Sequence, residues 1–155
     1  MNIRIFKWLN KPKSRTGYLR SKQIERRSIR QWTNKLHSSY GVKLVTVESG
    51  YLLDGFDLYH HMVTNGKRAA FDRTRATVYM RKGFTYYEIA HEASHAKHWH
   101  EIGDQQYSLL SDLEKETYVY EALILKAKNL TADELIDAKL YINRVRRLSN
   151  YPPLP

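Results

Sequence analysis

The sequence contains no cysteine among its 155 residues. This absence excludes a disulfide framework and any metal site built on thiolates. A metal would therefore have to be held by histidine, aspartate or glutamate. Long apolar runs are also missing, since no stretch approaches the roughly 18 residues that a membrane-spanning helix needs. The opening segment, MNIRIFKWLNKPKSR, lacks the apolar core of a secretory signal peptide, which predicts a cytoplasmic protein.

Acidic residues are nearly absent from the first quarter of the chain. Residues 1–40 contain 11 Lys and Arg but one acid, Glu25, whereas residues 41–155 contain 15 basic and 15 acidic residues. The formal net charge of +10 therefore lies on the first 40 residues. Such a basic arm is typical of a solvated tail, and it also suits nucleic acid or an acidic protein as partner. This division predicts a basic N-terminal arm and helix at 1–40 and a separate domain at 41–155.

The rest of the composition is that of a folded domain. With 155 residues and 42% apolar content, the chain can bury one core of its own. Helical periodicity predicts a basic helix over 19–38. Stretches rich in β-branched and aromatic residues predict three strands, at 42–48, 68–72 and 76–81, whereas 51–66 fits neither pattern.

Three capping boxes predict helix starts in the second half of the chain. In this motif a Ser or Thr side chain accepts from a backbone amide of the first helical turn, and a Glu three residues later reaches back to the cap amide. The pairs are Thr85 with Glu88, Ser111 with Glu114 and Thr131 with Glu134. They predict helices over 86–102, 112–129 and 132–148. The fold class is therefore α+β, a small β-sheet followed by a helical half.

The first of these helices contains His91, Glu92 and His95, the pattern His-Glu-x-x-His. Histidines four residues apart lie on one face of a helix, so both imidazoles can bind one Zn²⁺. Glu92 is rotated by about 100° from His91, and it can instead take a proton from a water molecule as general base. We therefore expect His91 and His95 to be zinc ligands and Glu92 to be the catalytic base. The competing hypothesis is a surface helix that matches a short pattern by chance.

A catalytic zinc site needs a third protein ligand, which we expect on the next predicted helix. Glu116 lies on the face of that helix that should pack inward, where an unpaired carboxylate is costly. Glu121, at the border of that face, is the alternative ligand. His98 lies about 4.5 Å further along the helix axis than His95, and His100 lies on the opposite face. We expect these last two histidines to be surface or supporting groups.

The sequence resembles, over residues 40–145, the zincin-like metallopeptidase toxin domains at the C-termini of bacterial polymorphic toxins. The likeness is carried by YEIAHEASHAKHWHEIG, EKETYVYEALI and DELIDAKLYINRV. It implies a gluzincin-type peptidase with Glu116 as third ligand, a protein or peptide substrate, an immunity protein as partner and delivery into a target cell. It also implies an edge strand that pairs with the substrate, for which residues 76–81 are the candidate. A tyrosine or histidine often stabilises the oxyanion in such enzymes, and Tyr107 and Tyr118 are candidates.

Two other functions are compatible with the sequence. If the basic helix is the functional element, the chain is a nucleic-acid-binding module and the histidine helix is only structural. The two readings combine in a DNA-associated or repressor-cleaving HExxH peptidase. A zinc-dependent peptidase is the leading prediction, because an HExxH match is expected by chance only roughly 0.02 times in a chain of this composition.

Overall fold

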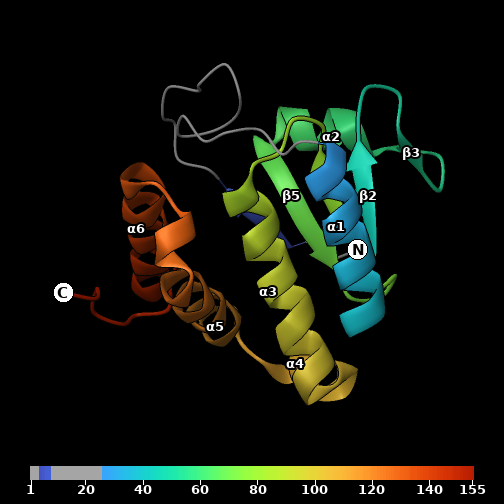
Figure 1. Cartoon of the computed structure of the whole chain (residues 1–155). Helices are drawn as coiled ribbons and strands as arrows, with labels where there is room; N and C mark the ends of the chain where they lie inside the picture. The colour runs from blue at the N-terminus through green and yellow to red at the C-terminus, as the bar shows by residue number, and fades with distance from the viewer. Residues whose placement is uncertain (1–3, 8–25) are drawn as a thin grey trace.

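The computed structural model describes residues 4–7 and 26–155. In that part of the chain, a four-stranded sheet, a two-stranded hairpin and six α-helices form an α+β fold, as the sequence predicts (Figure 1). The sheet has the order β1 (Arg4–Lys7), β5 (Lys67–Asp72), β6 (Thr77–Arg81) and β2 (Lys43–Val47). β6 is parallel to β2 and antiparallel to β5, and β1 is antiparallel to β5.

Helix α1 (Arg26–Tyr40) is the described portion of the basic helix predicted over 19–38; residues 19–25 lie outside the described residues. It ends at Gly41, as expected from the sequence. The φ of Gly41 is +67°, in the left-handed region, and its N–H donates to the carbonyl of His37 at 2.9 Å. A glycine adopts this conformation without the steric penalty that a Cβ would bring.

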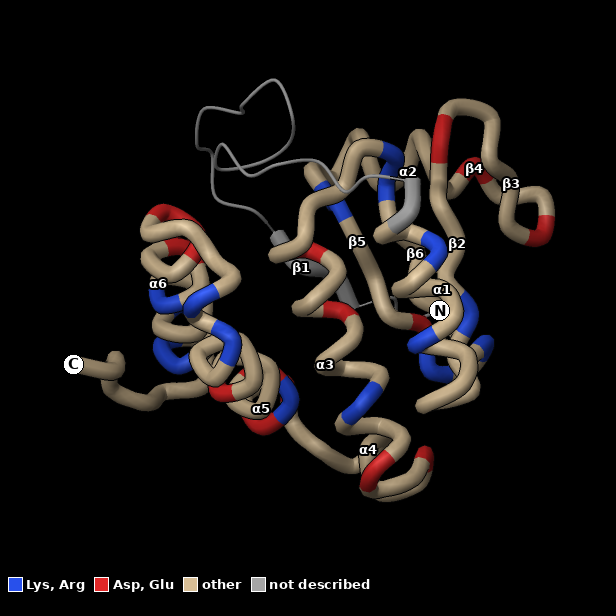
Figure 2. The backbone as a smooth tube through the Cα atoms, in the orientation of Figure 1, with Lys and Arg blue, Asp and Glu red and all other residues tan. Residues whose placement is uncertain are grey.

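Helix α1 packs in the same core as the residues that follow it. Leu36 is fully buried and belongs to one apolar cluster with Phe71 of β5 and Ile89 of α3 (Tyr86–Ile102). The helix carries basic residues and no Asp or Glu (Figure 2). Helix α1, which precedes residue 40, thus shares a core with the region that follows it. The predicted boundary at residue 40 stays a prediction about function.

The segment 51–66, which the sequence leaves open, forms a hairpin and a short helix. The hairpin joins β3 (Leu52–Leu53) to β4 (Phe56–Asp57), and it leads into α2 (Leu58–Thr64). Asp54 and Gly55, between the two strands, have positive φ angles of 51° and 80°. These are the signs of a type I′ turn, which the Asp-Gly pair favours.

Both faces of the sheet are covered. Val78 and Met80 of β6 point to one face and pack with the apolar side of α3. Tyr79, between them, points to the other face and packs with Leu58 and Met62 of α2. The central strands are therefore buried on both sides, which explains the apolar stretches at their centres, AAF in β5 and VYM in β6.

The three capping boxes are confirmed. Each Ser or Thr side chain accepts from the predicted amide, and each Glu accepts from the cap amide, at the starts of α3 and two further helices, α5 (Asp112–Leu125) and α6 (Ala132–Leu148). α5 ends earlier than predicted and is followed by a 3₁₀ turn, η2 (Ala127–Asn129). A short helix, α4 (Asp104–Leu109), was not predicted. No helix in the described residues is long and apolar enough to cross a membrane.

Helix α3 runs between the sheet and the pair α5–α6 (Figure 1). Ala93 and Ala96 belong to the cluster under the sheet, whereas Ala90 belongs to a second cluster with Val119 of α5 and Ala138 of α6. Alanines on both sides let its neighbours approach closely. The helix that bears the HExxH pattern is consequently buried along most of its length.

The prediction that residues 76–81 form the edge strand is wrong. β6 lies between β5 and β2 and pairs with both. The outer strands of the described sheet are β1 and β2. The short run of apolar residues at 76–81 correctly predicted a strand. The place of that strand in the sheet, however, depends on pairing with residues far away in the chain.

Candidate metal centre

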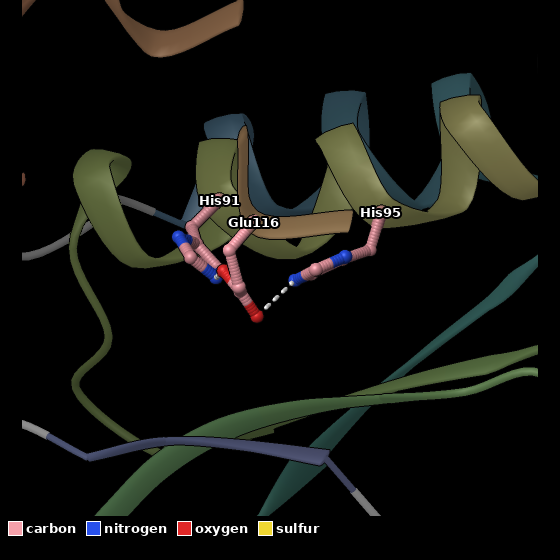
Figure 3. A group of neighbouring side chains, drawn as sticks. All are labelled: His91, His95 and Glu116. Atoms are coloured by element: carbon pink, nitrogen blue, oxygen red, sulfur yellow. Dashed lines mark ion pairs between the residues drawn. The ribbon is translucent and has the colours of Figure 1, made fainter. Parts of the chain in front are cut away.

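Two helices bring three metal-binding side chains together. His91 and His95 of α3 face Glu116 of α5, and all three point into one small volume (Figure 3). The distance from Nε2 of His91 to Oε2 of Glu116 is 3.5 Å, and that from Nε2 of His95 to Oε1 is 3.3 Å. One ligand atom from each residue lies within 4.8 Å of the other two. The arrangement is thus a convergent set of two imidazoles and one carboxylate.

Local packing sets this convergence. The two histidines are one turn apart, and their ring centroids lie 5.0 Å from each other. The capping box at Ser111 starts α5, and Val119 and Leu123 bury its apolar side in the cluster that contains Ala90. This packing turns Glu116 toward α3 and leaves it only 7% exposed.

Burial keeps His91 neutral in the metal-free protein. Its side chain is 3% exposed, and this burial lowers the pKa of the imidazole to about 3, with a smaller contribution in the same direction from His95. Glu116 acts in the opposite direction but does not prevail. A neutral imidazole has a lone pair available for a metal ion.

Glu92 is buried beside this group and is 2% exposed. Burial raises its pKa to about 8, and the nearby Glu116 contributes to the rise, whereas His95 and the backbone N–H of Phe71 favour the ionised form. A carboxyl with a pKa close to neutrality is suited to both accepting and returning a proton.

The hydroxyl of Tyr107 lies 3.0 Å from Nδ1 of His95. Nε2 of this ring faces Glu116, so Tyr107 lies on the opposite side of the imidazole. In the tautomer that leaves the Nε2 lone pair available, the Tyr107 hydroxyl accepts a hydrogen bond from Nδ1–H. Tyr107 is 4% exposed, and the ammonium group of Lys115 lies 4.7 Å from its ring centroid. This position does not suit the predicted oxyanion role of Tyr107.

The hydroxyl of the second oxyanion candidate, Tyr118, forms its hydrogen bonds outside the group of His91, His95 and Glu116. Its hydroxyl donates to Glu101 at 2.6 Å and accepts from Lys97 at 2.9 Å. Both partners are on the last turns of α3, and Glu101 is exposed. Tyr118 therefore holds a surface ion pair in this structure.

The remaining predicted residues lie outside the convergent group. Glu121, the alternative third ligand, is exposed, and the structure does not bring it to the histidines. His98 is buried rather than on the surface, and its ring stacks on Tyr118 with centroids 3.9 Å apart. His100 is exposed and has its ring 5.7 Å from that of Tyr40.

Neighbours from α6 complete the surroundings of the site. The ring of Tyr141 lies 6.0 Å from that of His91. Asp137 is 2% exposed and accepts a hydrogen bond of 3.3 Å from the hydroxyl of Tyr87. The sequence placed Asp137 and Tyr141 in a family motif but assigned them no role. Nothing in the sequence indicated Lys115, whose buried position depends on how α5 packs.

A family model described as Metallopeptidase toxin 4 matches residues 17–148. The match begins earlier than the resemblance over residues 40–145, and it includes α1. A search of curated proteins found no match, and neither did a search of solved structures. These findings give no support to the nucleic-acid-binding alternative. The chain belongs to the family of metallopeptidase toxins that this model describes.

Proposed function

We propose that the chain is a zinc-dependent peptidase in which His91, His95 and Glu116 hold the metal ion and Glu92 is the general base. The observation that carries this proposal is the convergence of three buried ligand atoms from two helices, within 4.8 Å of one another, beside a buried carboxyl group. Family membership supports the peptidase reaction and implies a metal.

The donor set fits zinc. Two imidazoles and one carboxylate are a known ligand set of catalytic zinc, and they leave a position open for water or substrate. The neutral state of His91 provides a lone pair without first releasing a proton. A cation between these residues would also offset the unfavourable burial of the Glu116 carboxylate. When bound, zinc would supply Lewis acidity, which lowers the pKa of water and polarises a carbonyl group.

The chain itself supplies proton transfer and orientation. Glu92 takes a proton from the attacking water and returns it to the leaving amide nitrogen. The backbone N–H of Phe71 favours the ionised form of Glu92, the form that accepts a proton. Tyr107 orients the ring of His95 from behind.

Metal analysis of the purified protein tests the ligand assignment, and the chain offers matched controls. His91→Ala and Glu116→Gln should each lose most of the bound zinc. His100→Ala and Glu121→Gln change the same residue types at exposed positions of the same two helices, and they should retain it. Retention of one zinc per chain by Glu116→Gln would remove this residue from the proposed site.

The role of Glu92 is tested separately. Glu92→Gln should bind zinc as the wild type does but fail to cleave an unfolded protein such as casein, because only the base is lost. Cleavage at the wild-type rate by this variant would contradict the mechanism while leaving the metal site intact.

Membership in a toxin family leads us to propose a protein of a target cell as the substrate and a dedicated immunity protein as partner. Delivery into that cell belongs to the same proposal. Expression of the wild type in a bacterial cytoplasm should arrest growth, and expression of Glu92→Gln at the same level should not. Equal growth in the two cultures would contradict the toxin role.

A further inference from the structure

Strand β1 covers one edge of β5. Arg4 lies opposite Phe71, Ile5 opposite Ala70 and Lys7 opposite Lys67, in antiparallel orientation. Without these four residues, β5 would be the outer strand on this side of the described sheet. The edge that β1 covers therefore belongs to a strand that is otherwise paired only with β6.

This edge of β5 lies beside the proposed active site. Phe71, which is opposite Arg4, has its ring 6.2 Å from that of Tyr107, and the Tyr107 hydroxyl lies 3.0 Å from Nδ1 of His95. Figure 3 shows that His91, His95 and Glu116 point from the helices toward the side on which β5 and β1 run. A chain segment paired with β5 at this register therefore passes beside the proposed metal centre.

An extended peptide binds to a free strand edge by adding one strand to the sheet. The main-chain hydrogen bonds of that edge can serve only one partner at a time. β1 is already an extended, antiparallel segment at this place, so β1 and a bound peptide exclude each other. If the site is the peptidase site that we propose, the position taken by β1 is that of a substrate strand.

The pairing of β1 is also limited. It comprises four residues, and its register is interrupted between Ile5 and Lys7. Short segments with few hydrogen bonds open at a much lower free energy than the core of a domain. Among the residues whose side chains the structure describes, β5, β6, β2 and the helices supply the core clusters beneath the sheet.

We infer that residues 4–7 act as an intramolecular strap that occupies the substrate edge of β5 and must leave before a peptide can bind. This inference rests on the proposed function only for the identity of the competing ligand, an extended peptide. It places the regulation of the site in this chain's own N-terminal segment.

The test is Ile5→Pro in the full chain, with Ile5→Val as its matched control. Proline has no N–H and a fixed φ, so it disrupts the ladder, whereas valine keeps the amide and favours a strand. Amides of β5 should exchange with solvent about tenfold faster in the proline variant. Equal exchange of these amides in the two variants would show that β1 does not cover the edge.

Peptide binding is measured on proline and valine variants that also carry Glu92→Gln, so that a bound peptide stays intact. The probe is the fluorescein-labelled peptide NIRIFKWL, which corresponds to residues 2–9, and its binding is followed by anisotropy. If β1 occupies the edge in 90 to 99% of molecules, the proline variant binds roughly 10- to 100-fold more tightly than the valine control. Equal affinity in the two variants, despite faster exchange of the β5 amides, would overturn the inference.

Activity separates the two proposals. With zinc and an intact Glu92, Ile5→Pro should cleave casein faster than Ile5→Val by a similar factor. If neither variant cleaves although the peptide binds as expected, the proposed peptidase function fails and the strap stands. If both cleave at the same rate, the strap fails and the peptidase function stands.

Discussion

Replacing Glu92 with glutamine should make the metal-free protein more resistant to alkaline destabilisation. Burial raises the pKa of this carboxyl group from 4.5 to about 8 in the folded state. The folded protein therefore binds a proton that the unfolded chain has released between these two values. A group of this kind stabilises the fold most at low pH, and its contribution is lost as pH rises from 4.5 toward 8.

The size of the effect follows from the two pKa values. In this interval the folded state binds one proton more than the unfolded state. Each unit of rising pH therefore lowers the free energy of unfolding by about 1.4 kcal/mol. Between pH 5.5 and 7.5, the wild type should thus lose about 3 kcal/mol relative to Glu92→Gln. The lowered pKa of His91 also makes stability depend on pH, but it is present in both proteins and cancels in the comparison.

Urea unfolding followed by circular dichroism, in the presence of a chelator, measures this difference at both pH values. Glu121→Gln is the matched control, since Glu121 is exposed on a neighbouring helix and should leave the pH dependence unchanged. Added zinc should reduce the difference, because a nearby cation favours the ionised carboxylate. A free-energy gap between wild type and Glu92→Gln that is the same at pH 5.5 and 7.5 would refute the reasoning.

Three further predictions concern stability and metal affinity. Arg68→Ala leaves the fully buried Glu88 without its ion pair of 3.1 Å and should cost about 3 kcal/mol of stability in urea unfolding. Lys82→Ala removes an exposed ion pair and should cost less than about 1 kcal/mol. Similar costs for the two variants would contradict the role of burial. Tyr107→Phe removes the hydroxyl behind a proposed zinc ligand and should weaken zinc binding about tenfold in a chelator competition. Thr131→Ala removes a helix cap and should cost about 1 kcal/mol, and a neutral result would contradict the capping role.

Interactions between residues close in the chain could be predicted from the sequence. The capping boxes of α3, α5 and α6 were predicted correctly, because each depends on hydrogen bonds between residues three apart. The spacing of His91 and His95 predicted that they share one helix face, and the two rings do face the same volume. α4 begins after Gly103, which has no side chain to form a capping hydrogen bond. The sequence therefore contained no sign of its start, and α4 was not predicted.

Interactions between distant segments could not be predicted in the same way. Glu116 and Glu121 lie on one helix, and only the rotation of α5 against α3 turns the first toward the histidines and the second toward solvent. Tyr107 likewise could be identified as a neighbour of the site, rather than as an oxyanion group, only from the position of α4.

The sequence by itself determined where α3, α5 and α6 begin and that two histidines and a glutamate share one of them. These features depend on hydrogen bonds and side-chain directions within a single turn of helix. Only the tertiary structure decided which carboxylate joins the histidines, that β6 lies inside the sheet, and that β1 covers the edge of β5. Those outcomes depend on how separate helices and strands pack, and the local pattern of residues is compatible with more than one such packing.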